Sequence, residues 1–133
     1  MKVLAIDYGT RTLGLAMWES SLSFPLPKKP IRVKNDDEAL AVLCGMVVAE
    51  AVDRLLLGLP GERDPGKSWI VRKIRAFGKR LEETSGVPVE LVPEAYSSQE
   101  AARVSTRPAA DDAVDSIAAA NILQRWLEQC ARA

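Results

Sequence analysis

Histidine is absent from this chain of 133 residues. The absence excludes His-dependent catalytic triads, histidine general bases and histidine metal ligands together. Two cysteines are present, Cys44 and Cys130, and their spacing matches no metal-binding or redox motif. We interpret them as buried or incidental thiols of a reducing compartment. The formal net charge is zero, so a polyanionic partner would have to meet a local basic patch.

Targeting and membrane-spanning segments are also missing from the sequence. The N-terminus lacks a signal peptide, and no apolar run is long enough to cross a bilayer. We therefore expect a soluble cytoplasmic protein without a membrane partner. Apolar residues make up 47% of the chain, which suffices for a core, and the length is that of one domain. We expect a single domain over residues 1–133.

The stretch VLAIDYGTRTLGLA at residues 3–16 predicts a β-hairpin built around one carboxylate. A short apolar run ends on Asp7, a turn-like segment follows, and the chain then becomes apolar again. A buried strand rarely ends on a charge unless that charge is used or paired. Gly9 suits a position that needs a positive φ or the close approach of a ligand. Asp7 is thus the first candidate for chemistry, and the alternative is a turn cap that binds backbone amides.

The segments after the hairpin predict alternating strands and helices. A proline-rich connection leads to a third, edge-like strand at 31–33, and a helix capped by Asn35 or Asp36 runs to about Ala51. The continuous apolar run at 55–59 predicts a central parallel strand.

The second half of the chain continues this pattern. A loop at 60–67 precedes a helix whose apolar face carries Ile70, Ile74, Phe77 and Leu81. A strand at 87–92 follows, then a short helix that starts at 97–100, and a last helix from 111 to about 130. Antiparallel strands followed by βα crossovers imply an α/β fold, a mixed sheet with helices on its faces.

Three carboxylates stand at element ends or on a helix face: Asp7, Glu94 after the last strand, and Asp115 in the final helix. Crowded carboxylates repel one another unless a cation neutralises them, and hard oxygen ligands select Mg²⁺ or Mn²⁺. Two such ions about 4 Å apart would hold the attacking and leaving oxygens of a phosphodiester. Asp111 and Asp112 flank Asp115, and Asp112 is a further candidate ligand. The alternative for both is that they complement the helix N-terminus.

Basic and aromatic side chains near these acids are candidates for contacts with nucleic acid. Tyr8 and Tyr96 flank two of the acids and would either stack on bases or lie in the core. Trp69, Phe77 and Trp126 are assigned to packing. The basic helix face that follows residue 67 is either a phosphate-binding or a solvated surface. The candidate phosphate ligands are Arg11, Arg63, Lys67, Arg72 and Lys73.

Residues 61–68, GERDPGKS, match the pattern of an ATP-binding P-loop. Pro65 removes one backbone donor, and Glu62 and Asp64 would place negative charge against the phosphates. We keep a P-loop ATP-binding protein as a remote alternative. The favoured interpretation is a surface loop whose Arg63 and Lys67 contact the nucleic-acid backbone.

Four ordered segments, IDYGTRTLGLA, LLLGLP, PVELVPEAYSSQEA and DSIAAANILQRWL, resemble the motifs of the YqgF/RuvX family of RuvC-like, RNase H-fold nucleases. The resemblance covers nearly the whole chain. It implies one RNase H-like domain with a five-stranded mixed sheet of order 3-2-1-4-5 and helices on both faces. It also implies that Asp7, Glu94 and Asp115 are the metal-binding catalytic residues.

The same resemblance implies a substrate and an assembly. The substrates associated with the family are the 5′ leader of pre-16S rRNA and the four-way DNA (Holliday) junction. The expected activity is therefore metal-dependent endonucleolytic hydrolysis of structured nucleic acid. Because a resolvase cuts two symmetric strands, the resemblance also favours a homodimer.

The chain departs from the family pattern at two places. The family usually has Asp-Glu-Arg-Leu around the middle carboxylate, whereas this chain has Pro93-Glu94-Ala95-Tyr96 and so lacks the arginine. The segment 105–110, often rich in lysine and glycine, is nearly uncharged here. These departures keep open a second function, a nucleic-acid-binding module without catalysis.

Overall fold

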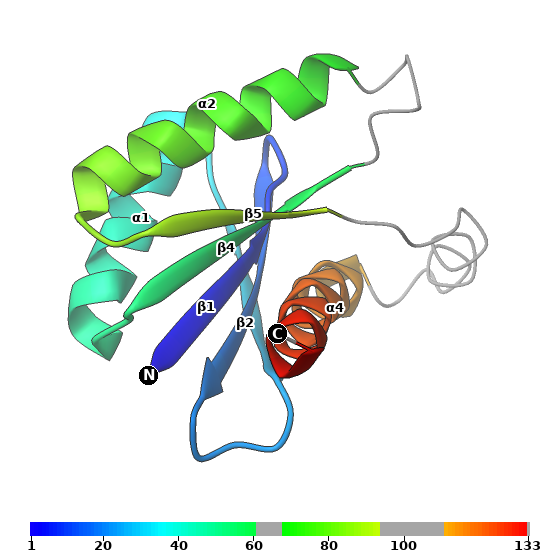
Figure 1. The fold of residues 1–133 in the computed structure, drawn as a ribbon. Helices are drawn as coiled ribbons and strands as arrows, with labels where there is room; N and C mark the ends of the chain where they lie inside the picture. The colour runs from blue at the N-terminus through cyan, green and yellow to red at the C-terminus, as the bar shows by residue number, and fades with distance from the viewer. Residues whose placement is uncertain (61–67, 94–110, 133) are drawn as a thin grey trace.

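The computed structural model describes the backbone of residues 1–60, 68–93 and 111–132, and their side chains except at 111–115 and 132 (Figure 1). The described elements follow the predicted order. They are β1 (Lys2–Asp7), β2 (Thr12–Glu19), β3 (Leu26–Arg32), α1 (Asp36–Glu50), β4 (Arg54–Leu59), α2 (Ser68–Ser85), β5 (Val89–Pro93) and α4 (Asp111–Arg132).

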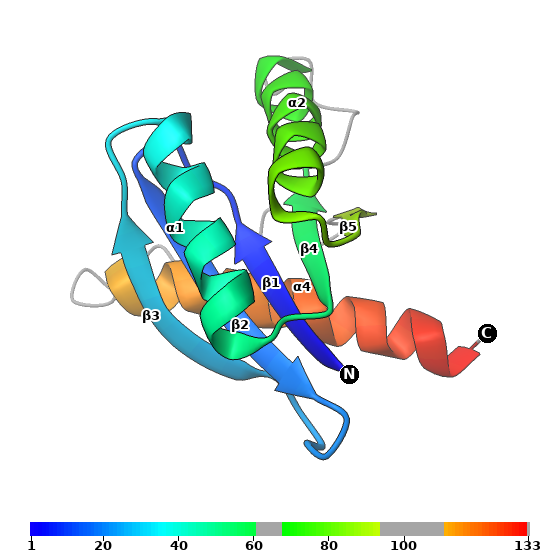
Figure 2. The ribbon, with the colours of Figure 1, turned by 90° about the vertical axis from the view of Figure 1, so that its left-hand side faces the viewer.

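The five strands form one mixed sheet in the order β3-β2-β1-β4-β5, as predicted. β2 is antiparallel to β1 and β3, whereas β4 is parallel to β1 and β5. Helices α1 and α2 cover one face of the sheet and α4 covers the other (Figures 1 and 2). The predicted α/β class and the predicted helices on both faces are thus confirmed.

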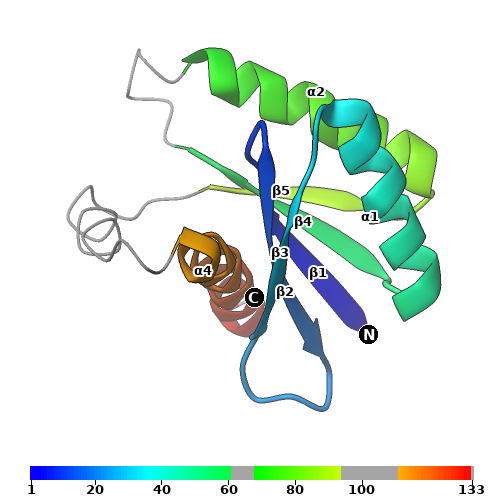
Figure 3. The same cartoon turned by 180° about the vertical axis from the view of Figure 1, so that it is seen from behind.

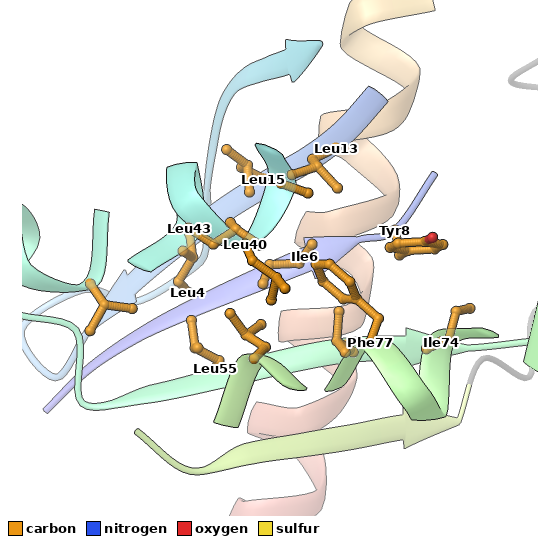
Figure 4. Packing of buried hydrophobic residues seen from close by; sticks show 14 of the residues in the cluster. Leu4, Ile6, Tyr8, Leu13, Leu15, Leu40, Leu43, Leu55, Ile74 and Phe77 are labelled. Atoms are coloured by element: carbon orange, nitrogen blue, oxygen red, sulfur yellow. The ribbon is translucent and has the colours of Figure 1, made fainter. Parts of the chain in front are cut away.

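The two-residue period of β1 divides the core between the two faces of the sheet. Leu4 and Ile6 point toward α1 and α2, in a cluster that includes Phe77 (Figure 4). Val3 and Ala5 belong to the cluster under α4. These four of the six side chains of β1 are fully buried, so the strand is fixed on both faces before it ends at Asp7.

Helix α1 begins and ends close to the predicted residues. The Asn35 side chain accepts a hydrogen bond of 2.9 Å from the backbone N–H of Glu38, which makes Asn35 the N-cap. Ala51 closes the helix in the left-handed conformation, with a φ of 53°.

The third strand is longer than the predicted segment 31–33. It begins at Leu26 and includes two prolines, Pro27 and Pro30, which lack the N–H that a sheet ladder needs. Because β3 pairs only with β2 and lies at the edge of the sheet, it tolerates both prolines.

The last strand is displaced from the predicted range 87–92. It runs from Val89 to Pro93 because residues 85–87 are used to end α2. Gly86 has a φ of 74°, and the Val87 N–H donates to the Ser85 hydroxyl. Pro93 is tolerated at the end of a strand that pairs with β4 alone.

Two of the three side chains assigned to packing are buried, and the assignment of Trp69 is wrong. Phe77 and Trp126 are 1% and 8% exposed, whereas Trp69 is 54% exposed. The buried face of α2 carries Ile74 and Leu81, and a period of 3.6 residues per turn places position 69 on the opposite side of the helix. None of the described helices combines the length and the apolar character that a membrane span requires.

Candidate functional site

Asp7 is the last residue of β1, where the central strand of the sheet reaches its carboxyl end. Its side chain is half-buried, and its backbone pairs with Gly14 of β2. Gly9 does not have a positive φ, so the first of its two predicted reasons is wrong, and the close approach of a ligand stays a prediction. A Cβ atom at Gly9 would instead lie 2.5 Å from the backbone oxygen of Thr12, so the turn is too tight for any side chain there.

The carboxyl ends of the three parallel strands lie at one edge of the sheet. Ile6 is level with Leu57 of β4, which is level with Leu91 of β5. Pro93 ends β5 at this edge. Glu94 follows in sequence and lies outside the described residues, so its predicted role stays a prediction.

The beginning of α4 is fastened to the sheet near the same edge. The Ser116 hydroxyl, which is buried, donates a hydrogen bond to the backbone oxygen of Lys28 in β3. Lys28 pairs with Leu15, and Leu15 pairs with Ile6, the residue before Asp7. The first turns of α4 therefore lie at the level where β1 ends.

The predicted metal ligands of α4 belong to these first turns. The backbone of Asp112 and Asp115 is described, but their side chains are not. Among the side chains that are described, no three acidic or cysteine residues cluster closely enough to hold a metal ion. Because Asp7 belongs to the described side chains but Glu94 and Asp115 do not, the three-carboxylate site remains a prediction.

Tyr8 is part of the core, which was one of its two predicted placements. Its side chain is 7% exposed, and its ring centroid lies 4.9 Å from that of Phe77 (Figure 4). Its hydroxyl donates a hydrogen bond of 2.6 Å to Asp36. Burial, and then the bond to the Asp36 carboxylate, raise the pKa of the Tyr8 hydroxyl well above its ordinary value. In this position the Tyr8 ring cannot stack on a base.

A groove rich in basic side chains opens beside the turn that follows Asp7. It has a volume of about 480 Å³ and is lined by residues of the β1–β2 turn, the beginning of α1 and one side of α2. Figure 3 shows how these three segments are arranged. The backbone N–H of Val33 donates a hydrogen bond of 2.9 Å to the backbone oxygen of Arg11. This bond ties the β1–β2 turn to the segment that leads into α1. This basic groove is lined by Thr10, Arg11, Lys34, Asn35, Asp36, Asp37, Lys73 and Arg80.

The basic groove contains two of the predicted phosphate ligands, Arg11 and Lys73. It also contains Lys34 and Arg80, which were not among the predicted site residues. Arg72 is exposed on α2 but does not line the groove. The other predicted contacts, Arg63, Lys67 and Tyr96, lie outside the described residues, as does the P-loop-like segment up to residue 67.

The acidic side chains of the basic groove are already bonded. Asp36 accepts the Tyr8 hydroxyl, and Asp37 accepts a hydrogen bond of 2.7 Å from Arg80. This bond raises the pKa of the Arg80 guanidinium. Four basic and two acidic side chains line the groove, which leaves an excess of two positive charges. Within the described ranges, the other three groove cations form no ion pair: Arg11, Lys34 and Lys73.

Solved structures with a similar fold include two proteins in complex with Holliday junctions. Thermus thermophilus RuvC in complex with a Holliday junction substrate superposes with a TM-score of 0.62 at 17% identity, covering 97% of this chain and 96% of that one. The Fowlpox virus resolvase in complex with Holliday junction DNA has a TM-score of 0.55 at 12% identity, covering 96% of this chain and 99% of that one. At these identities the likeness shows the shared fold alone.

Sequence relatives match more closely and over the full length. A protein of Lawsonia intracellularis, named as a candidate pre-16S rRNA nuclease, is 37% identical over 97% of this chain and 94% of its own. A protein of the same name from Nitratidesulfovibrio vulgaris is 35% identical over 96% of this chain and 93% of its own. The family model RuvX, described as Holliday junction resolvase, matches residues 1–129. The chain therefore belongs to the RuvX family.

Proposed function

We propose that the protein is a metal-dependent endonuclease that hydrolyses phosphodiester bonds in structured nucleic acid. The observation that carries the proposal is the meeting of three chain segments at one edge of the sheet. β1 ends there on Asp7, β5 ends there on Pro93, and Ser116 fastens the beginning of α4 at the same level. Membership of the RuvX family supports the same activity.

The residues proposed to act at this edge are Asp7, Glu94 and Asp115, with Asp112 as a further ligand. β1 and β5 are separated only by β4, so their backbones lie about 10 Å apart at two strand spacings. An all-carboxylate donor set suits Mg²⁺ or Mn²⁺ and needs no histidine. When bound, such ions supply an activated water and stabilise the leaving oxygen of the cut strand.

The residues that follow Asp7 hold the end of β1 in place and support a fixed position for its carboxylate. Tyr8 anchors the chain directly after Asp7 through its bond to Asp36 and its ring contact with Phe77. Gly9 allows the tight turn that follows. The half-buried position of Asp7 limits the motion of its side chain, so the carboxylate is held in place before a ligand arrives.

The proposed substrate is either a pre-16S rRNA or a four-way DNA junction. The first follows from the names of the sequence relatives, and the second from the family description. Both kinds of molecule are found in the bacterial cytoplasm, where we propose that the protein acts. Cleavage of a junction would further require a homodimer, because two symmetric strands must be cut together.

Cleavage of two labelled substrates tests the proposal. One is a mobile four-way DNA junction, and the other is an RNA that spans the 5′ boundary of 16S rRNA. Wild type and Asp7→Asn are compared with Mn²⁺, Mg²⁺ or EDTA. The matched control is Asp53→Asn, because Asp53 is exposed and its carboxylate accepts the N–H of Lys2 at the opposite edge of the sheet.

We expect metal-dependent cleavage by wild type and by Asp53→Asn, and its loss in Asp7→Asn with binding retained. Symmetric nicking of the junction alone would identify a resolvase, and cleavage of the RNA alone an rRNA-processing nuclease. If both substrates are bound and neither is cut with any metal, the protein is a nucleic-acid-binding module and the catalytic proposal is wrong.

A further inference from the structure

Trp69 stands at the beginning of a stripe of side chains along the exposed side of α2. Its indole is 54% exposed. Lys73 follows one turn later and Arg80 seven residues after that, so all three lie on one side of the helix. The buried side chains of α2, such as Ile74 and Leu81, occupy the opposite side.

This stripe forms one wall of the basic groove. Lys73 and Arg80 line the groove from α2, and Arg11 and Lys34 line it from the segments below. Figure 3 shows the β1–β2 turn beneath α2 and beside the beginning of α1. Trp69 therefore lies one helical turn beyond the groove-lining Lys73, toward the beginning of α2.

The charge of the basic groove suits a chain of phosphates. The whole protein has no net charge, yet the groove has an excess of two positive charges. Its carboxylates are engaged by Tyr8 and Arg80. The groove is open to solvent rather than enclosed, so it accommodates a polymer more readily than a small anion, which would need to be enclosed.

The exposed indole suits a nucleobase that is not paired. The other two tryptophans, Trp18 and Trp126, contact each other edge to face with centroids 6.4 Å apart. Trp69 is the exposed member of the three, and burial is the usual placement for so large an apolar ring. Aromatic side chains beside a basic groove bind single strands because an unstacked base offers a free face, which a base inside a duplex does not.

We propose that an unpaired strand of nucleic acid lies in the basic groove, with one of its bases stacked on Trp69. The inference rests on the proposed function only in taking nucleic acid as the substrate. It adds that the protein recognises a single-stranded stretch next to the cut site, rather than duplex alone. The nucleic-acid strand reaches the cut site past the β1–β2 turn. Thr10 and Arg11, which line the groove there, follow Asp7 by three and four residues.

Binding in the presence of EDTA tests this inference without cleavage. The full-length chain is titrated with a labelled single-stranded oligonucleotide and with the matching blunt duplex. We expect Trp69→Ala to weaken binding of the single strand by about 5- to 150-fold and to leave duplex affinity within about twofold. We expect single-strand binding to quench tryptophan fluorescence in wild type and not in Trp69→Phe, because the remaining Trp18 and Trp126 pack under α4 on the other face of the sheet.

The cations are tested by the salt dependence of the same titration. Lys73→Ala and Lys34→Ala should each lower the slope of log affinity against log salt by about 0.7 for the single strand. Lys79→Ala is the matched control, because Lys79 is an exposed lysine of the same helix that does not line the groove. It should leave the slope unchanged.

Two results would overturn the inference: single-strand affinity that is unchanged in Trp69→Ala, or a loss in Lys79→Ala equal to that in Lys73→Ala. Thermal unfolding checks that every variant is folded, which the exposure of these side chains leads us to expect. The two proposals fail separately. If wild type cleaves its substrate and Trp69→Ala still binds the single strand normally, the groove proposal is wrong and the nuclease proposal stands. If the single strand binds in the groove and wild type cleaves nothing, the nuclease proposal is wrong and the groove proposal stands.

Discussion

Replacing Gly9 by alanine tests the turn that follows Asp7. The added Cβ would lie 2.5 Å from the backbone oxygen of Thr12, which is closer than a carbon and an oxygen can approach without displacement. The obstructing atom belongs to the backbone of the first residue of β2, so no side-chain rotation relieves the contact. We expect the free energy of unfolding to fall by about 1–3 kcal/mol, the usual cost of overpacking.

Gly45→Ala is the matched control for this change. Gly45 lies inside α1, and a Cβ there meets no atom within 4 Å. Because alanine is the better helix former, we expect the free energy of unfolding to rise by about 0.5–1 kcal/mol. Urea unfolding followed by circular dichroism measures both variants under one condition, and the two substitutions should move the midpoint in opposite directions.

The same pair of variants separates stability from chemistry. A displaced turn moves Asp7, whose position two residues before Gly9 makes it part of the same bend. We expect Gly9→Ala to cleave more slowly at saturating substrate while it binds nearly as well, and Gly45→Ala to cleave as wild type. A Gly9→Ala variant with wild-type stability and rate would show that the turn relaxes freely and that the steric argument is wrong.

The remaining predictions concern single side chains. Tyr8→Phe leaves Asp36 without its donor, and urea unfolding should show a loss of about 1 kcal/mol. Because the pKa of Tyr8 is raised in the folded state, stability should hold up to about pH 10 and fall above it, and the fall should be smaller in Tyr8→Phe. Phe77→Ala, at a fully buried position, should cost about 3–5 kcal/mol, whereas Trp69→Ala should cost less than about 1 kcal/mol in the same assay. Asn35→Ala removes the cap of α1 and should cost about 1 kcal/mol by thermal unfolding.

The elements that the sequence predicts best are those whose pattern reflects burial on both faces. The apolar run around Leu56 has no polar face, and it is indeed the parallel strand beside β1. The helix cap at Asn35 is a local signal that needs no tertiary context, and it too is found. The edges of the sheet are predicted less well, because an edge strand such as β3 keeps polar residues and prolines that also suit a loop.

Trp69 shows that residue type alone can predict the wrong degree of burial. A tryptophan beside an apolar helical stripe is usually a core residue, and the sequence alone favours that assignment. The helical period argues otherwise, because position 69 lies opposite Ile74, at the centre of the buried face of α2. The position of a residue around the helix axis therefore predicts its burial better than its residue type does. An aromatic side chain that lies on the side of the helix facing away from the core is a candidate for binding.

The basic groove as a whole cannot be predicted from the order of residues along the chain. Arg11, Lys34 and Lys73 come from a hairpin turn, a helix entry and a helix face that are far apart in sequence. The basic face of the helix after residue 67 indicates a phosphate-binding surface in the sequence, but the sequence does not show that Arg11 and Lys34 lie beside it. The sheet order brings the three segments together, because β1 occupies the centre and α2 crosses above the turn where β1 leaves the sheet (Figure 3). An electroneutral protein can thus present a positive surface beside the end of β1 at Asp7, and the proposed metal-dependent nuclease would need both: cations to hold the phosphates, and carboxylates to hold the metal.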